Sequence, residues 1–153
     1  MKIKSLIVLG IVAVMFSSCK KDDESQADID DRIIQDYLKE HNLDAEKHES
    51  GLYYIITVEG TGEHPTLSST VEVLYKGYLT DGTVFDETSD NAPVSFPLQS
   101  LIAGWQIGIP LMKPGGQATF FLPSHLGYGS SPQNGIPANS VLIFDITLLD
   151  FTN

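Results

Sequence analysis

The sequence is poor in positive charge. It has nine lysines and arginines against 20 aspartates and glutamates, and its formal net charge is −11. Between residues 51 and 153 arginine is absent, and the only lysines are Lys76 and Lys113. Proteins that bind nucleic acid need basic patches for the phosphates, so no nucleic-acid partner is expected. The same charge argues against adsorption of the protein surface on an anionic membrane.

Motifs for metal, phosphate or covalent chemistry are also missing. The four histidines are His41, His48, His64 and His125. No two of them lie four residues apart on one predicted helix, so neither a metal site nor a cofactor is expected. Gly115-Gly116 lies in a predicted turn and not between a strand and a helix, as a phosphate loop requires. Ser124-His125 lacks the elbow motif of a serine hydrolase.

Cysteine occurs once, and no apolar run is long enough to span a bilayer. The longest run, residues 6–16, has 11 residues, whereas a spanning helix needs about 20. Lys2 and Lys4 precede it and Ser17-Ser18-Cys19 follow, a pattern typical of a bacterial lipoprotein signal. We expect residues 1–18 to be a signal peptide and Cys19 to be lipidated. A buried helix, a free thiol and an ordinary signal peptide stay open.

Residues 19–27 are expected to form a polar tether. Without residues 1–18 the chain loses Lys2 and Lys4, which takes the net charge from −11 to −13. Lys20-Lys21-Asp22-Asp23-Glu24 indicates either a solvated linker or a signal for export to the outer cell surface. The expected location is the bacterial cell envelope, lipid-anchored in the outer membrane on its periplasmic face or at the cell surface.

Residues 28–48 are expected to form an amphipathic helical arm, helical to about His41. Apolar residues recur at spacings of three and four, and three aspartates suit a helix N-terminus. These residues are Ile29, Ile33, Ile34, Tyr37 and Leu38, with Asp28, Asp30 and Asp31. A helix this short is marginal in isolation. We therefore expect it to dock on the following domain, the alternative being a frayed arm.

Residues 51–153 are expected to form an α+β domain, an antiparallel sheet of about five strands around one short helix. The predicted strands are 52–59, 71–80, 83–86, 94–98, 117–122 and 140–151. Alternation places Val71, Val73 and Tyr75 on one face. Asp81-Gly82 predicts a tight hairpin with positive φ at both positions.

Residues 98–108 are the one helix candidate of this domain, with Leu98, Leu101, Ile102 and Trp105 on one face.

The most specific pattern runs from residue 104 to residue 151. It comprises Gly104-Trp105, Gly108, Met112, Gly115, Pro123-Ser-His-Leu-Gly-Tyr128-Gly129 and Ile136-Pro137-Ala-Asn-Ser-Val-Leu-Ile-Phe144-Asp145. Aromatic and apolar side chains between glycine turns can build a dry pocket. The run resembles the FK506-binding-protein (FKBP) family of peptidyl-prolyl isomerases, and the resemblance covers residues 51–153.

The resemblance implies that a prolyl peptide binds between the sheet and the helix. By matching motif, the catalytic residues would be Tyr75, Phe85, Asp86, Trp105, Tyr128 and Phe144, and the substrate-binding residues would be Phe96, Leu101, Ile102 and Ile136. Trp105 would lie under the proline ring, and the Ile102 N–H and the Tyr128 hydroxyl would donate to substrate carbonyls. Implied partners are proline-containing polypeptides and an FK506- or rapamycin-type macrolide. The implied function is isomerisation that assists the folding of exported proteins.

Without the resemblance these residues have ordinary explanations. A single tryptophan on an apolar helix face is usually core, and Phe85, Phe96 and Phe144 fit strand alternation. Tyr128 then becomes a turn residue.

Asp86 is where the sequence departs most from the family. A carboxyl group at a dry pocket needs hydrogen-bond partners, and in the family an arginine usually supplies them. Here the Tyr75 hydroxyl or water would do so. The missing arginine, together with Val94 in place of an aromatic residue, favours an alternative function as a non-catalytic proline-binding module or chaperone. A purely structural envelope protein is a third reading. Larger relatives dimerise through long N-terminal helices, so this short arm predicts a monomer.

Overall fold

The computed structural model describes residues 24–89 and 92–153. The predicted signal peptide, Cys19 and most of the predicted tether lie outside the described residues. Among the described helices, none combines the length and the apolar character that a membrane crossing requires.

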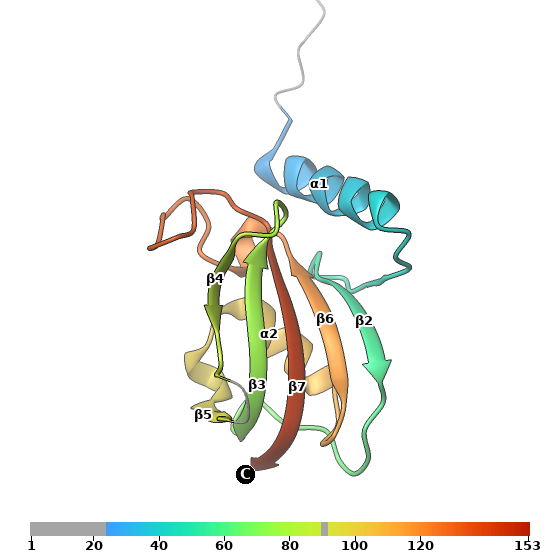
Figure 1. Cartoon of the computed structure of the whole chain (residues 1–153), viewed down its shortest axis with the longest axis vertical. Helices are drawn as coiled ribbons and strands as arrows, with labels where there is room; N and C mark the ends of the chain where they lie inside the picture. The colour runs from blue at the N-terminus through green and yellow to red at the C-terminus, as the bar shows by residue number, and fades with distance from the viewer. Residues whose placement is uncertain (1–23, 90–91) are drawn as a thin grey trace, which may run out of the picture.

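An antiparallel sheet forms the body of the protein (Figure 1). Its seven described strands are β1 (Glu46–Lys47), β2 (Tyr53–Val58), β3 (Thr70–Leu79), β4 (Val84–Glu87), β5 (Val94–Pro97), β6 (Gln117–Leu122) and β7 (Leu142–Thr152). Their order is β1-β2-β6-β7-β3-β4, and β5 pairs with β3 beyond this path. The α+β prediction is confirmed. The sheet has seven described strands where about five were predicted, partly because β1 comes from the segment that was expected to be part of the helical arm.

The central strand β3 shows why the sequence alternates. Val71 and Val73 are fully buried, whereas Lys76 is exposed on the other face, as predicted. The expected hairpin exists, but its predicted geometry is wrong. Gly82 alone has a positive φ, of 85°, and its N–H donates to the Leu79 carbonyl. The loop is one residue longer than a two-residue turn, so Asp81 needs no left-handed backbone.

The predicted helix at residues 98–108 is correct only in its second half. Leu98–Ser100 forms the 3₁₀ turn η1, Leu101 is extended, and α2 begins at Ala103 and ends at Gly108, before the 3₁₀ turn η2 (Ile109–Leu111). The Leu98 N–H donates to the Ser69 carbonyl, which ties this segment to the loop before β3. α2 lies very close to β6, since a Cβ on Gly104 would come 2.2 Å from Leu122 Cδ2.

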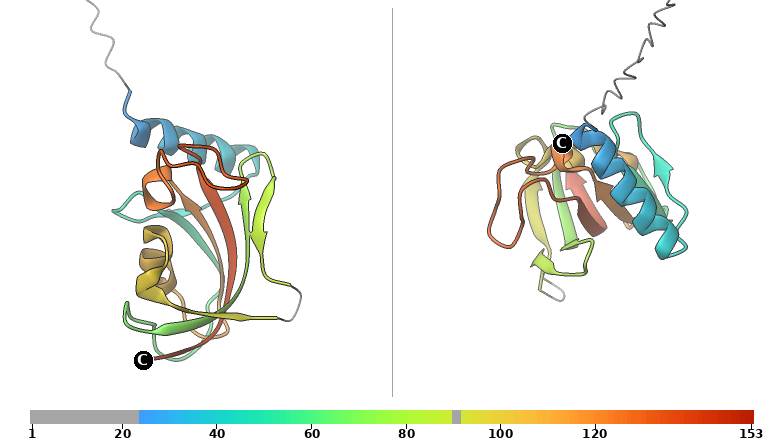
Figure 2. Two further views of the ribbon diagram at one scale, coloured as in Figure 1. Left: turned by 90° about the vertical axis from the view of Figure 1, so that its left-hand side faces the viewer. Right: turned by 90° about the horizontal axis from the view of Figure 1, so that it is seen from above.

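Helix α1 (Gln26–Glu40) docks on the sheet, as predicted. It begins two residues earlier than expected because Ser25 and Asp28 form a capping box. Ile34 and Leu38 are buried against Tyr53, Phe121 and Ile143, whose side chains point away from α2. Figure 2 shows α1 crossing one end of the sheet while α2 lies on the other face.

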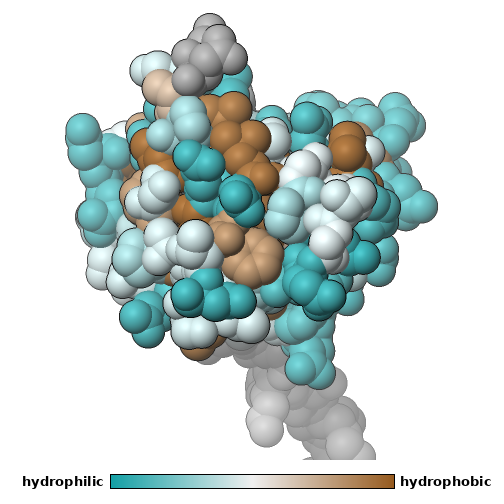
Figure 3. Space-filling view, turned by 90° about the horizontal axis from the view of Figure 1, so that it is seen from below, coloured by the Kyte–Doolittle hydropathy of each residue, from teal (hydrophilic) through white to brown (hydrophobic). Residues whose placement is uncertain are grey.

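The opposite end of the molecule carries the loop between β2 and β3 (Figure 1). Viewed from below, its surface shows apolar patches broken up by hydrophilic side chains (Figure 3). Leu67, in this loop, is 50% exposed.

Candidate active site

A cavity of about 510 Å³ opens between the inner face of the sheet and α2. All ten residues predicted for the site line it: Tyr75, Phe85, Asp86, Phe96, Leu101, Ile102, Trp105, Tyr128, Ile136 and Phe144. They come from β3, β4, β5, β7, α2, the two residues just before α2, and the long loop between η3 (Ser124–Leu126) and β7. Figure 2 shows α2 lying against the concave side of the sheet.

The aromatic rings meet edge to face and do not stack. The Trp105 and Phe144 ring centroids lie 5.4 Å apart with an interplanar angle of 89°. The Tyr75 ring lies 5.2 Å from Trp105 at 85°, and Phe85 lies 5.5 Å from Phe144 at 83°. This geometry is favourable for aromatic pairs. Together these rings form the apolar part of the cavity wall.

The polar contact at the cavity mouth joins Tyr75 and Asp86. The Tyr75 hydroxyl donates to Asp86 Oδ2 at 2.6 Å, so the hydrogen bond expected in place of an arginine is present. Burial, and secondly this hydrogen bond, raise the pKa of the Tyr75 hydroxyl above its ordinary value of 10.0. Asp86 is otherwise exposed. The ion pairs formed by residues 24–89 and 92–153, Arg32–Glu24 and Lys47–Asp31, lie at α1.

Two hydrogen-bond donors on residues that line the cavity have no partner in the described chain. The Ile102 N–H, at the start of α2, has no acceptor among residues 24–89 and 92–153. The Trp105 side chain is 4% exposed, and its buried indole N–H likewise lacks an acceptor in that part of the chain. Buried donors usually find acceptors. A carbonyl group entering the cavity could accept from the Ile102 N–H, whereas the indole N–H is covered by the protein.

Tyr128 lies at the rim and is 38% exposed. It is held between Gly127 and Gly129, whose N–H groups both donate to the Ser124 carbonyl. Gly129 has a φ of 57°, a left-handed conformation that glycine adopts without strain.

Sequence reasoning missed three lining residues, Ser100, Gln133 and Asn134. Their polar side chains carried no periodic signal, and they lie on turns. Val94 does not line the cavity and packs against the core beside it.

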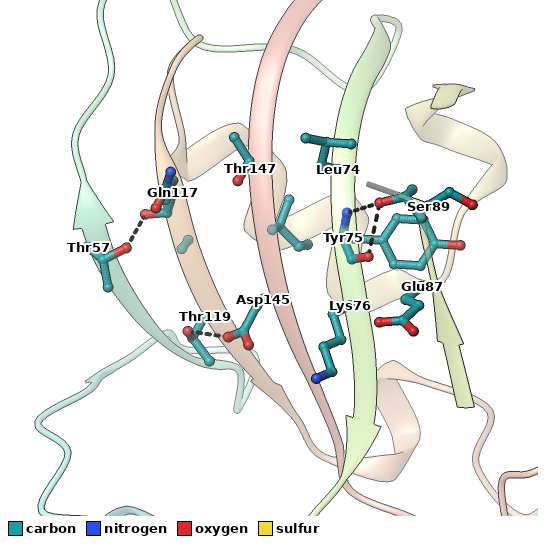
Figure 4. A pocket seen from close by; sticks show the side chains of 13 residues that line it. Thr57, Leu74, Tyr75, Lys76, Glu87, Ser89, Gln117, Thr119, Asp145 and Thr147 are labelled. Atoms are coloured by element: carbon teal, nitrogen blue, oxygen red, sulfur yellow. Dashed lines mark hydrogen bonds between the residues drawn. The ribbon is translucent and has the colours of Figure 1, made fainter. Parts of the chain in front are cut away.

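A second hollow, of about 590 Å³, lies on the outer face of the sheet (Figure 4). Its wall is polar. Thr57 donates to the Gln117 carbonyl, Thr119 donates to Asp145, and Thr88 exchanges hydrogen bonds with the Tyr75 backbone. Tyr75 is the only residue that borders both this hollow and the inner cavity, and its ring belongs to the inner cavity. No group of three or more potential metal ligands is present in the described chain.

Comparison with known proteins agrees with this geometry. The sequence profile of the FKBP-type peptidyl-prolyl cis-trans isomerase family matches residues 61–149. The chain belongs to this family. FkpA of Aeromonas hydrophila, an FKBP-type peptidyl-prolyl cis-trans isomerase, is 49% identical over 102 residues, which are 66% of this chain and 38% of that protein. FkpA of Escherichia coli (strain K12) is 44% identical over 102 residues, with the same shares. The FKBP chain therefore spans less than half the length of these relatives.

Solved structures show the same FKBP fold. The crystal structure of Escherichia coli FkpA aligns with a TM-score of 0.73 and 36% identity, covering 82% of this chain and 61% of that one. A peptidyl-prolyl cis-trans isomerase from Pseudomonas syringae aligns with a TM-score of 0.71 and 25% identity, covering 83% and 96%. Both alignments extend beyond the 89 residues of the family match at residues 61–149.

Proposed function

We propose that this protein is a peptidyl-prolyl cis–trans isomerase that acts on exported polypeptides. One observation supports the proposal most strongly: the ten residues inferred from the sequence line a single apolar cavity that remains open to solvent. Uncatalysed isomerisation takes tens to hundreds of seconds, slow enough to limit folding.

The mechanism follows from the apolar wall. Rotation about the X–Pro bond has a barrier of about 18–20 kcal/mol because resonance holds the amide planar. The planar amide is more polar than the twisted one, since resonance places negative charge on oxygen. A cavity that removes water therefore disfavours the planar ground state relative to the twisted transition state. Each ~1.4 kcal/mol of this difference gives about a tenfold rate increase.

The polar groups would orient the substrate within this cavity. The proline ring would lie on Trp105, with Tyr75, Phe85, Phe96 and Phe144 as walls. The Ile102 N–H would donate to one substrate carbonyl and the Tyr128 hydroxyl to another, near the twisting bond. Leu101 and Ile136 would complete the apolar contact. None of these steps requires covalent chemistry.

We further propose that the protein is a lipid-anchored monomer in the bacterial outer membrane. The amino-terminal pattern that ends at Cys19 supports the anchor, and stable anchoring takes more than one acyl chain. Burial of the apolar stripe of α1 on its own sheet supports a monomer, because that stripe is not available to a second chain. Replacing Cys19 with alanine should move the protein from the membrane fraction to the soluble envelope fraction.

A protease-coupled isomerisation assay tests the activity. We expect the wild-type chain to isomerise a Leu-Pro peptide, the Trp105→Leu variant to lose most of this activity, and the Tyr128→Phe variant to retain roughly a tenth to a third of it, the loss of about one hydrogen bond. Absence of turnover by folded wild-type protein would refute the proposal.

The alternative, a proline-binding module, is favoured by the exposed Asp86 without an arginine. An FK506-type macrolide distinguishes the two. Inhibition of turnover supports the isomerase, whereas macrolide binding without any turnover supports the binding module.

A further inference from the structure

One buried acid lies outside the cavity, on α1. Asp30 has 0% of its surface exposed, and it is the only buried aspartate or glutamate of residues 24–89 and 92–153. Its Oδ2 accepts hydrogen bonds from Ser124 N at 2.8 Å and from Ser124 Oγ at 2.6 Å, and its Oδ1 accepts one from Gln26 Nε2 at 2.7 Å. A buried carboxyl group is tolerated where such bonds replace water.

Ser124 in turn holds the backbone that carries Tyr128. Its carbonyl accepts hydrogen bonds from the N–H groups of Gly127 at 2.9 Å and Gly129 at 2.8 Å, the residues on either side of Tyr128. The Gly129 carbonyl accepts another from Asn139 N at 2.7 Å. Hydrogen bonds that run through Asp30 and then through Ser124 therefore connect α1 to the tyrosine at the cavity rim.

Tyr128 has little other support within the described chain. Its side chain is 38% exposed, and no aromatic ring of residues 24–89 and 92–153 packs on its ring. Its position therefore depends on the turn beneath it. The Ser124 carbonyl holds this turn, and the Ser124 N–H and hydroxyl both donate to one carboxyl oxygen of Asp30.

We propose that Asp30 is a positioning residue for Tyr128, so that α1 sets the place of the hydroxyl group that donates to the substrate. Asp30 lies outside residues 61–149, the segment that the family profile matches. The inference rests on the proposed function for the role of Tyr128. It makes α1 a part of the active-site architecture as well as a cover for the sheet.

A double-mutant cycle on the full chain tests this coupling. Asp30→Ala leaves the Ser124 N–H and hydroxyl without an acceptor, and we expect kcat/KM to fall about three- to tenfold as the tyrosine shifts, no further than in Tyr128→Phe. In a Tyr128→Phe background the same replacement should lower kcat/KM by less than about twofold, because the hydroxyl it positions is gone. Independent, multiplicative losses would overturn the proposal.

Two matched variants separate positioning from general damage to α1. Ile34→Ala removes buried packing from the same helix without contacting Ser124, so it should lower Tm and leave kcat/KM within about twofold of wild type. Asp30→Asn keeps one oxygen for Ser124, while the Gln26 amide can turn its oxygen towards the new NH₂ group, so activity should return. Equal losses of kcat/KM for Ile34→Ala and Asp30→Ala would show that docking alone matters.

Amide hydrogen exchange gives a readout that does not depend on turnover. We expect Asp30→Ala to speed exchange at Gly127 and Gly129 relative to the β7 amides, and Ile34→Ala to leave this ratio unchanged. If wild-type protein shows no turnover, the proposed function fails, while this ratio still reports on Asp30. An unchanged ratio in Asp30→Ala would refute the positioning role.

Discussion

The two faces of the sheet carry neighbouring rows of residues on the same three strands, but the two rows differ in what covers them. On the inner face Phe120, Phe144 and Gly77 pair across β6, β7 and β3. On the outer face the next residues along, Phe121, Ile143 and Tyr78, pair in the same way. The outer row is covered by α1. In the inner row, Phe144 lines the cavity.

The difference arises from what covers each row. The 15 residues of α1 supply Ile34 and Leu38, which pack on Phe121 and Ile143 with at most 8% exposure. The inner face carries the larger core, packed against the six residues of α2 and the turns η1 and η2, but part of it stays open at the cavity. The outer row therefore serves stability alone, whereas the inner row, one residue along each strand, serves both stability and recognition, because successive side chains point to opposite faces.

The largest expected effects come from removing one aromatic ring from each face. Phe121→Ala should lower the free energy of unfolding by about 3–5 kcal/mol, since the ring is 1% exposed, and leave kcat/KM of the folded fraction unchanged. Phe96→Ala should cost only about 1–2 kcal/mol because its ring is half-buried, but should lower kcat/KM at least about tenfold by admitting water. Urea denaturation and the isomerisation assay measure both. The comparison fails if Phe121→Ala lowers kcat/KM more than Phe96→Ala does, or if Phe96→Ala lowers stability more than Phe121→Ala does.

A methyl group at Gly77 should damage the cavity through its rings. The added Cβ would lie 2.6 Å from Phe85 Cε2 and 2.8 Å from Phe144 Cε1, so both rings must move. We expect Gly77→Ala to cost about 1–3 kcal/mol of stability and to raise KM severalfold. Gly108→Ala is the control, since its Cβ would meet Phe120, which does not line the cavity. It should destabilise the fold without raising KM.

Removal of the acid at the cavity mouth should affect turnover more than folding. Asp86→Leu leaves the Tyr75 hydroxyl without its acceptor, and we expect turnover to fall about tenfold. The unfolding free energy should change by less than about 1 kcal/mol because Asp86 is exposed. Glu87→Leu, next to it and on the outer hollow, should leave turnover unchanged. An unaltered rate for Asp86→Leu would remove Asp86 from the site.

The smallest expected effect is on alkaline stability. Burial raises the pKa of both Tyr75 and Tyr78 above 10.0, so each is protonated in the folded state at a pH where the unfolded chain has begun to ionise. Stability from these groups is present below about pH 10 and declines as pH rises further. Urea midpoints at about pH 8 and about pH 11 test this. Tyr78→Phe, on the outer face, should reduce the loss of stability at high pH without changing turnover. Tyr75→Phe should reduce that loss and also lower turnover.

The sequence predicted most of the fold where its signal was periodic. Alternation in β3 indicated the inner and outer faces, and the spacing of Ile34 and Leu38 indicated a docked helix. Leu101 was wrongly predicted to be helical because its apolar character suits a helix. Its backbone is extended, and the hydrogen bond from Leu98 N–H to the Ser69 carbonyl ties this segment to the loop before β3. The cap at Ser25 was visible as a serine three residues before an aspartate, although the helix was expected to start later.

The site residues followed from ordered motifs, but contacts between distant residues did not. Asp30 and Ser124 are 94 residues apart, and no pattern in the sequence pairs them. The long loop carries no periodic signal, and which of its side chains turn towards the cavity depends on the Gln133–Ile136 bridge. Such pairings are set by the assembled fold.

The borders of the sheet have a consequence for a protein proposed to handle unfolded chains. On one side β1 covers only Tyr53 and Tyr54, so the rest of β2 is border, interrupted by a register shift between Ile56 and Val58. On the other side the borders are β4 and β5, with four residues each, and Pro97 ends β5. Long exposed borders recruit extended polypeptides through main-chain pairing, whereas short ones interrupted by proline do not. A client segment therefore finds few places to add itself as a further strand, which should limit co-aggregation.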